Sequence, residues 1–137
     1  MSLVLDCSAT LAWASDDETT DPIRAVWERI GDSGAVVPTL WRLEVANSLT
    51  VAVRRKRIDA EFRRSVLVDL AVLDIAVDRE TDEQAWTNTL VFADNHRLTL
   101  YDAAYLELAV RRGLRLATLD RELIAAARSI GVPTLGT

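Results

Sequence analysis

The chain has 137 residues, of which 50% are hydrophobic and 27% are charged. This composition is typical of one globular domain, which we expect to span residues 1–137, and it argues against a disordered or fibrous protein. Cys7 is the one cysteine, so the sequence excludes an internal disulfide and a zinc site built from cysteines. The net charge of −5 argues against broad nonspecific binding of nucleic acids but leaves room for a local basic patch.

The sequence carries no sign of a membrane or export segment. No apolar run reaches the ~18 residues needed to span a bilayer, and the N-terminus lacks a basic region followed by an apolar stretch. A single free cysteine also suits a reducing compartment. We therefore expect a cytoplasmic protein that does not bind a membrane.

The first half of the chain alternates short apolar runs with amphipathic segments. Leu3–Leu5 is an apolar run with a β-branched centre, and Asp6 and Ser8, which follow it, are residue types that begin helices. Ala35–Val37 predicts a second buried strand, and residues 73–77, which alternate with aspartates, predict a third, less buried strand. Hydrophobic residues at helical spacing predict helices over residues 22–30, 38–57 and 60–70.

The second half continues the same alternation. Helical patterns cover residues 81–95 and 100–112, and Gly113 ends the second of them. Residues 115–118 predict a strand. A last helix over residues 121–129 and an edge strand over residues 132–135 complete the chain. Short strands alternating with amphipathic helices predict an α/β fold with a mainly parallel sheet.

Many acidic residues on the expected helices have an arginine one helical turn away, as is usual on solvated helix faces. These pairs are Asp21 with Arg24, Glu28 with Arg24, Asp59 with Arg63, Glu61 with Arg64, Asp94 with Arg97, and Glu107 with Arg111. Glu44, Asp102 and Asp120 differ, because the residues three and four positions away from each are uncharged. Asp6 closes the first apolar strand. These acids therefore lack a local partner of opposite charge.

The same four acids are expected to meet at one edge of the sheet. Asp6 and Asp120 directly follow strands, while Glu44 and Asp102 lie early in helices. In a parallel sheet each helix begins at the carboxyl edge of the strand before it, so such positions gather on one side of the domain. Two carboxylates ~5 Å apart repel by about 3 kcal/mol at an effective dielectric of 20. A divalent cation would relieve this repulsion, and oxygen ligands without histidine or cysteine favour Mg²⁺ or Mn²⁺.

Each acid also has a purely structural explanation. Asp6 and Asp120 could be ordinary helix N-caps, and Asp102 could complete a capping box with Thr99. Glu44 fits this explanation least well, because it lies past the capping positions of its helix. One shared site explains all four acids more economically than four separate caps.

Four stretches of the chain carry a family resemblance. They are Val4–Ser8, Pro38–Asn47, Tyr101–Tyr105 and Ala117–Asp120, each of which contains one of the four acids. In their order and spacing, the sequence resembles the PIN-domain family, and most closely its VapC-type toxins. The resemblance spans nearly the whole chain.

The resemblance implies a three-layer α/β/α sandwich and a metal-dependent endoribonuclease. Asp6, Glu44, Asp102 and Asp120 would be the catalytic, metal-binding quartet for Mg²⁺ or Mn²⁺. Asp6 and Asp102 would be the principal ligands, and Glu44 and Asp120 would be second ligands or water-orienting bases in the hydrolysis of an RNA phosphodiester. Ser8 and Thr118 match supporting hydroxyl positions beside the first and last acids. The resemblance further implies a homodimer and a small antitoxin protein that covers the groove.

A basic run and some alternatives remain open from the sequence. Arg54, Arg55, Lys56 and Arg57 could guide RNA toward the cleft, or they could simply stabilise the end of a helix.

Ser8 stands where a haloacid-dehalogenase phosphatase needs a second aspartate, and no phosphate-binding glycine-rich loop is present. The remaining alternative is a catalytically weak protein-binding module whose acidic cleft captures an arginine of a partner.

Overall fold

The computed structural model describes residues 3–137, which contain one sheet of five parallel strands. The strand order across the sheet is β3-β2-β1-β4-β5. The strands are β1 (Leu3–Leu5), β2 (Ala35–Val37), β3 (Ile75–Val77), β4 (Arg115–Ala117) and β5 (Thr134–Leu135). The expected α/β fold with a parallel sheet is confirmed.

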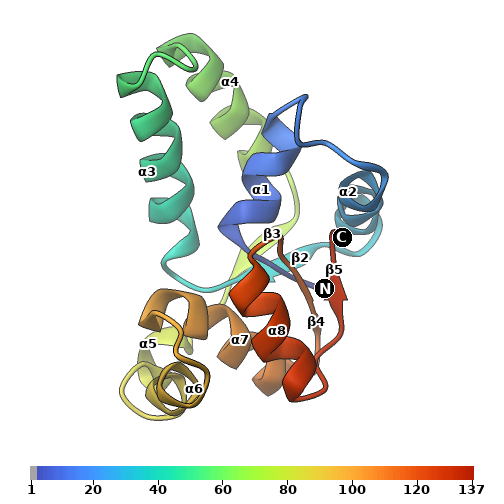
Figure 1. Cartoon of the computed structure of the whole chain (residues 1–137). Helices are drawn as coiled ribbons and strands as arrows, with labels where there is room; N and C mark the ends of the chain where they lie inside the picture. Colours follow the sequence, from blue (N-terminus) through green and yellow to red (C-terminus); the bar gives the residue numbers. More distant parts are fainter. Residues whose placement is uncertain (1–2) are drawn as a thin grey trace.

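Helices cover both faces of this sheet. Figure 1 shows α1 to α4 on one side and α5 to α8 on the other. The helices are α1 (Cys7–Ala14), α2 (Asp21–Ser33), α3 (Trp41–Arg54), α4 (Ala60–Ala71), α5 (Thr81–Gln84), α6 (Asn88–His96), α7 (Leu100–Arg112) and α8 (Arg121–Ser129). Within residues 3–137, no helix combines the length and apolar character needed to cross a membrane. The expected three-layer α/β/α sandwich is confirmed.

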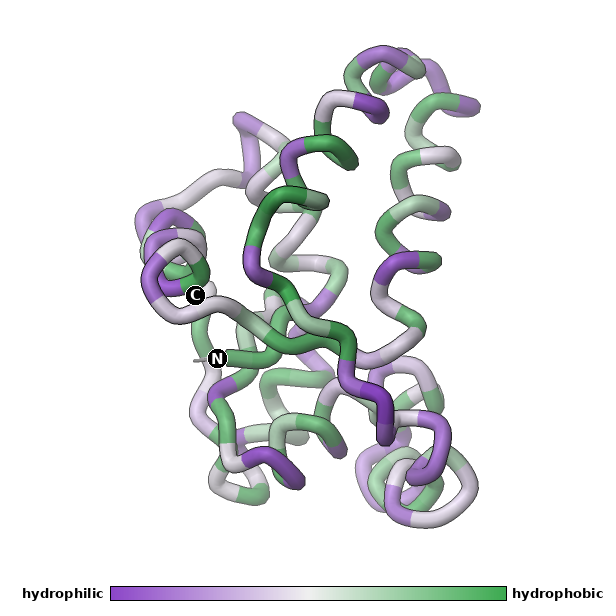
Figure 2. Tube along the Cα trace, turned by 180° about the vertical axis from the view of Figure 1, so that it is seen from behind, coloured by the Kyte–Doolittle hydropathy of each residue, from purple (hydrophilic) through white to green (hydrophobic). Residues whose placement is uncertain are grey.

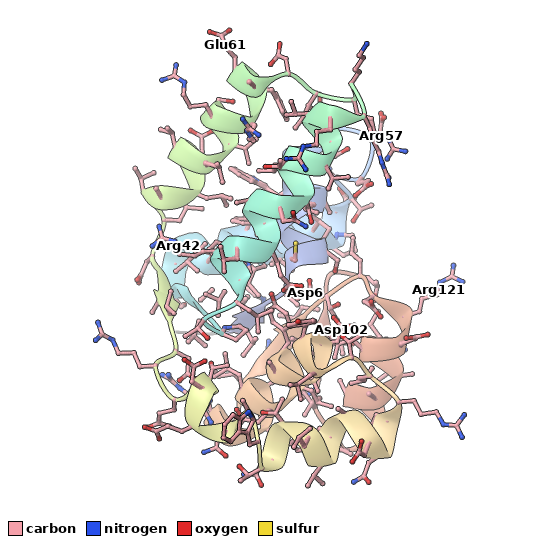
Figure 3. All side chains as sticks on the ribbon, turned by 90° about the vertical axis from the view of Figure 1, so that its left-hand side faces the viewer. Asp6, Arg42, Arg57, Glu61, Asp102 and Arg121 are labelled. Carbon is pink, nitrogen blue, oxygen red and sulfur yellow. The ribbon has the colours of Figure 1, made fainter. Side chains whose placement is uncertain are left out.

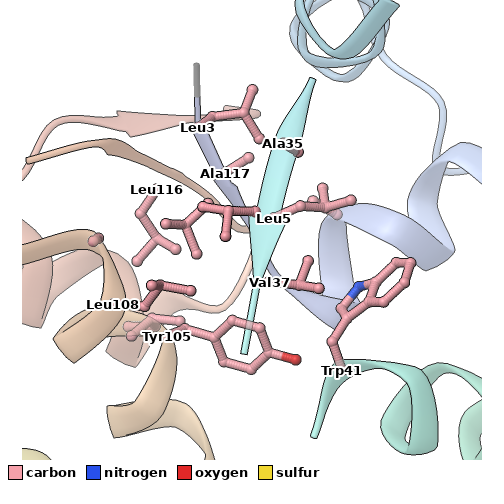
Figure 4. Packing of buried hydrophobic residues seen from close by; sticks show 14 of the residues in the cluster. Leu3, Leu5, Ala35, Val37, Trp41, Tyr105, Leu108, Leu116 and Ala117 are labelled. Carbon is pink, nitrogen blue, oxygen red and sulfur yellow. The ribbon is translucent and has the colours of Figure 1, made fainter. Parts of the chain in front are cut away.

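The strands form the centre of the hydrophobic core. Residues of β1 and β2 are fully buried, as continuous apolar runs predict for strands covered on both faces. Figure 2 shows hydrophobic positions gathered in these central strands, with hydrophilic positions on the outer parts of the helices. Tyr105 and Leu108 of α7 pack beside Leu116 of β4 (Figure 4). The core thus fixes α7 against the middle of the sheet.

The order of the strands places a topological switch between β1 and β4. From β1 the chain moves outward to β2 and β3, whereas β4 returns to the other side of β1 and leads to β5. Leu5 of β1 lies opposite Ala117 of β4, so both strands end at the same level. In open parallel sheets, ligands bind outside the carboxyl ends of the strands at such a switch. Residues directly after Leu5 and Ala117 are therefore in the position expected for a binding site.

The prediction of one helix over residues 81–95 is wrong, because this segment is divided into α5 and α6. Residues 85–87 form a turn, and Thr87 has a non-helical backbone conformation with φ −124° and ψ −99°. Threonine and asparagine are weak helix formers, so Thr87 and Asn88 add little that would continue the helix. The break allows α6 to turn back and pack along α7.

The bounds of two helices also differ from expectation, and α3 ends at Arg54 rather than Arg57. α3 begins at Trp41 rather than Pro38, because the Pro38 carbonyl accepts the N–H of Trp41 at 3.1 Å in a preceding turn. α2 continues past Gly31, and Gly34 ends it with a φ of 72°. A β-carbon at Gly34 would lie 2.6 Å from Asp74 Oδ2, so close packing as well as backbone conformation favours glycine here.

A buried ion network connects the end of β3 to α7. Arg111 Nη2 lies 2.7 Å from Asp78 Oδ2, and Arg111 Nε lies 2.8 Å from Glu107 Oε2. Glu107 is only 2% exposed, so its expected pairing with Arg111 forms inside the protein rather than on a solvated face. Burial raises the pKa of the Asp78 carboxyl, but the hydrogen bonds and charge of Arg111 outweigh burial and hold that pKa below its ordinary value.

Candidate metal centre

Asp6 lies at the carboxyl end of β1 and is the N-cap of α1. Its Oδ1 accepts the N–H of Ala9 at 2.9 Å, so the structural explanation as a helix cap holds for this residue. Its side chain also accepts hydroxyl hydrogen bonds from Ser8 at 2.7 Å and from Thr118 at 2.5 Å. Burial raises the pKa of Asp6 to about 6 although these hydrogen bonds lower it, and the negative charge of Asp120 adds to the rise.

Ser8 and Thr118 connect the end of β1 to the end of β4. Thr118 is fully buried, and its hydroxyl accepts the N–H of Asp120 at 3.0 Å while donating to Asp6. Ser8 Oγ accepts the N–H of Leu119 at 2.9 Å. Asp120 is the N-cap of α8, where its Oδ1 accepts a backbone N–H at 3.1 Å. The two hydroxyls therefore hold Asp6 and Asp120 at the switch point.

Glu44 reaches the same region from the first turn of α3. The start of α3 is fixed to α1, because Trp41 Nε1 donates to Thr10 Oγ1 at 3.0 Å. The Tyr105 hydroxyl donates to Glu44 Oε1. Figure 4 shows this hydroxyl pointing toward the start of α3, away from Leu108. Burial raises the pKa of Glu44, the hydrogen bond from Tyr105 lowers it, and the negative charge of Asp102 raises it further.

Asp102 lies in the first turn of α7, which Thr99 caps by accepting the N–H of Asp102 at 3.1 Å. Thr99 therefore caps α7 through its hydroxyl, which is the threonine half of the expected capping box. Burial raises the pKa of the Asp102 carboxyl, and the next largest cause is the negative charge of Asp120. The negative charge of Glu122, on the first turn of α8, raises the pKa of Asp102 by a smaller amount.

The four acids interact electrostatically with one another. Asp120 raises the pKa of both Asp6 and Asp102, and Asp102 raises that of Glu44. Burial raises the pKa of the Cys7 thiol to about 11, and the charges of Glu44, Asp6 and Asp102 contribute to that rise. Asp6 and Asp102 lie centrally in Figure 3, between α3 and α7. We call Asp6, Glu44, Asp102 and Asp120 the acid cluster.

In the part of the chain that the structure describes, no cationic side chain forms an ion pair with the acid cluster. The ion pairs among residues 3–137 connect Arg24 with Asp21, and Arg111 or Arg112 with Asp78, Glu80 or Glu107, and so include none of the cluster. Within the same residues, no three Asp, Glu, His or Cys side chains are already close enough together to hold a metal ion. Ligation would therefore draw the carboxylates inward, and their oxygen-only chemistry fits Mg²⁺ or Mn²⁺.

The basic run lies away from the acid cluster. Arg54 ends α3, and Arg55, Lys56 and Arg57 form the exposed turn toward α4. Figure 3 shows Arg57 at the far end of α3, away from Asp6 and Asp102, which lie near the middle of the molecule. The position agrees with the alternative that these cations stabilise a helix end.

Two residues near the acid cluster were not predicted from the sequence. Tyr105 binds Glu44 across 61 positions of sequence, so no local pattern could reveal the contact. Glu122 is an exposed acid in a first helical turn, which looks like an ordinary favourable charge at a helix N-terminus. Its position two residues after Asp120 was the available signal.

Comparisons with known proteins agree with this architecture. The sequence matches the PIN domain family over residues 3–129. It is 31% identical over 125 residues to Ribonuclease VapC3 of Pyrobaculum aerophilum, covering 90% of this chain and 92% of that protein. The crystal structure of PAE2754, from the same organism, is 25% identical with a TM-score of 0.67, covering 98% of this chain and 89% of that chain.

A second structural neighbour has the same fold. The crystal structure of VapC20 of Mycobacterium tuberculosis, described as a sarcin-ricin loop cleaving toxin, is 18% identical with a TM-score of 0.65. The similarity covers 91% of this chain and 95% of that chain. The chain therefore belongs to the PIN domain family, and the relatives it resembles within that family are of the VapC type.

Proposed function

We propose that the chain is a Mg²⁺- or Mn²⁺-dependent endoribonuclease and the toxin of a toxin-antitoxin pair. The observation that carries this proposal is the acid cluster, which forms no ion pair among the described residues and lies at the switch point of the sheet. Unscreened carboxylates would repel an RNA phosphate, so a bound cation would strengthen binding of the substrate at this site. Similarity to Ribonuclease VapC3 supports RNA as the substrate class.

The four acids of the cluster would hold the metal. When bound, the ion would supply positive charge to the phosphoryl oxygens and make a water molecule more acidic. Asp6 and Asp102 would be the principal ligands. Asp6 suits this role because Ser8 and Thr118 fix its orientation by hydrogen bonds. Burial disfavours the ionised form of Asp6 and raises its pKa, and a bound cation would favour the ionised form.

Glu44 and Asp120 would be second ligands or would orient the attacking water. Tyr105 holds Oε1 of Glu44, which leaves Oε2 to accept a proton or to bind the ion. Asp120 keeps its orientation through the cap of α8 and through the bond from its N–H to Thr118. A protein nucleophile is not needed for this hydrolysis.

The proposed partners follow from the same relatives. An antitoxin would cover the acid cluster, and a guanidinium on it would be a suitable counter-charge for carboxylates. We also propose a homodimer and a cytoplasmic location, as the sequence led us to expect. Arg54, Arg55, Lys56 and Arg57 remain candidate contacts to distant parts of a long RNA.

Expression of the chain without a partner, followed by mapping of RNA ends, tests the proposal. We expect new RNA ends and growth arrest with the intact chain and neither with Asp6→Ala. The purified chain should cleave RNA with Mn²⁺ and not with EDTA, and Asp6→Asn should lower the rate by more than about 100-fold. Asp69→Asn, which removes an exposed acid of α4, is the matched control and should cleave normally. Metal-dependent cleavage that survives Asp6→Asn would overturn the proposal.

A further inference from the structure

A small pocket lies beside the acid cluster. It has a volume of about 190 Å³ and is formed by the turn before α3, by α5, by Thr89 of α6 and by the start of α7. Tyr101, which lines it, directly precedes Asp102, and Leu40, which also lines it, directly precedes the helix that carries Glu44. Drug-sized ligands occupy pockets of roughly 300–1,000 Å³, so this pocket suits a single ring.

Thr89 gives this pocket an unused hydrogen-bonding group. The residue is 1% exposed, and its hydroxyl has no hydrogen-bond partner. Buried hydroxyls are normally paired, and leaving one unpaired costs about 1–3 kcal/mol. A threonine hydroxyl can donate or accept and rotates to suit its partner. The unmet bond therefore points to a ligand that enters the pocket.

The remaining wall combines an aromatic ring with polar groups. Tyr101 is 65% exposed, which is unusual for an aromatic residue next to a partly buried acid. Thr39 Oγ1 donates to Asp82 Oδ1 at 3.2 Å, and both side chains line the pocket. The lining of this ring-sized space thus includes an aromatic side chain, a carboxylate and a threonine whose buried hydroxyl is unpaired.

We propose that this pocket binds one unpaired base of the RNA, from a nucleotide next to the phosphate held at the acid cluster. Proteins that read single-stranded RNA stack bases on aromatic side chains and bond their polar edges, and this pocket has both elements. Tyr101 stacks on the base, while Asp82 accepts a base N–H and Thr89 completes the contact. The inference rests on the proposed function, because it takes RNA as the substrate.

This assignment gives the pocket a role in selecting the RNA. Stacking on Tyr101 is available to every base, whereas bonds to Thr89 and Asp82 depend on which groups the base edge presents. Tyr101→Ala should therefore weaken binding of all bases. Thr89→Val should change the order of preference among bases. The competing occupant is a side chain of a partner protein. If the pocket binds such a side chain instead, neither Tyr101→Ala nor Thr89→Val should change RNA binding.

Binding of short RNA strands in EDTA separates this inference from catalysis. The probes are labelled single strands of eight A, C or U nucleotides and an abasic strand of the same length, measured by fluorescence anisotropy. Every position of a uniform strand offers the same base, so the position of the bound phosphate does not matter. We expect the wild-type chain to bind at least one base-bearing strand more tightly than the abasic strand.

The pocket variants should remove that difference. Tyr101→Ala should weaken binding of the base-bearing strands roughly 5- to 150-fold, and Thr89→Val roughly 2- to 10-fold with a changed base preference. Trp86→Ala and Thr87→Val are matched controls, because both side chains are exposed near α5 and α6 outside the pocket. Thr89→Val removes an unpaired hydroxyl and should leave thermal stability unchanged or raised.

The two proposals fail in different ways. Equal binding of abasic and base-bearing strands, or wild-type binding by both pocket variants, would overturn the base pocket. Absence of new RNA ends after expression of the wild-type chain without a partner would instead overturn the ribonuclease, whatever the binding results.

Discussion

Two groups of acids near the carboxyl edge of the sheet are treated differently by the fold. Asp78 directly follows β3, as Asp6 directly follows β1. Asp78 lies 2.7 Å from Arg111, and its pKa is lowered. The pKa of Asp6 is instead raised to about 6, and that carboxylate has hydroxyl and backbone partners but no arginine within ion-pair distance.

A structural acid and a functional acid therefore differ in whether the chain supplies a cation beside them. An acid after a parallel strand is common, and its position alone does not assign a role. Where the chain supplies a cation, the acid helps to hold the fold. Where the chain supplies no cation and places several acids close together, their repulsion destabilises the fold locally. Such an arrangement is typical of a ligand-binding site.

The sharpest test of this contrast compares Arg111→Met with Asp102→Asn in EDTA. Arg111→Met leaves the buried Glu107 without its cation and leaves Asp78 with only Arg112, at 3.7 Å, so the free energy of unfolding should fall by about 3–5 kcal/mol. Asp102→Asn removes a repelled charge and should leave stability unchanged or raised. Urea unfolding monitored by circular dichroism measures both changes. Destabilisation by both variants to a similar extent would remove the distinction between the two regions.

The pH dependence of stability gives the next largest expected effect. The pKa of Asp6 rises from 3.8 to about 6 on folding, so its protonated form is favoured in the native state. The stability contributed by this residue is therefore full below about pH 4 and is lost as pH rises through 6, by about 3 kcal/mol in total. Asp6→Asn should remove this dependence.

Urea unfolding of wild type and Asp6→Asn across this range, in EDTA, measures the effect. The free energy of unfolding of Asp6→Asn relative to wild type should grow from pH 4 to pH 8. In a separate measurement near pH 8, with Mn²⁺ in place of EDTA, the ion should stabilise only the wild-type chain. A constant difference between the two proteins at every pH would contradict the raised pKa of Asp6.

Tyr105→Phe should have the smallest effect of the three. The substitution keeps the buried ring and removes the hydroxyl that donates to Glu44 Oε1. Groups that orient metal ligands typically change metal affinity by about 10- to 100-fold, so calorimetric titration should show weaker Mn²⁺ binding by that factor. Leu108→Ala, a core truncation in the same helix, is a control for packing and should change stability more than metal affinity. Unchanged Mn²⁺ affinity in Tyr105→Phe would remove Tyr105 from the site.

Much of the fold followed from local patterns. Continuous apolar runs such as Leu3–Leu5 predicted strands buried on both faces, and Gly113 correctly marked the end of α7. The order of the strands and the break at Thr87 did not follow, because both depend on how distant elements pack. In particular, α6 turns back onto α7, which no pattern within residues 81–95 specifies.

The acid cluster was selected by what its members lack. Glu44, Asp102 and Asp120 have no charged residue one helical turn away, and that criterion separated them from acids such as Asp21. The same criterion could not classify Asp78, whose cation lies 33 residues further along the chain. Long-range pairs of this kind, including that of Tyr105 with Glu44, appear only when the chain is folded.

The central claim is that Asp6, Glu44, Asp102 and Asp120 together hold a divalent metal ion. The most direct measurement is an anomalous difference map from crystals grown with Mn²⁺. We expect one or two peaks at the ends of β1 and β4, each about 2.0–2.4 Å from carboxylate oxygens of Asp6 and Asp102. Crystals of Asp6→Asn should lose this density. Manganese bound elsewhere in the wild-type chain, with the acid cluster empty, would contradict the claim.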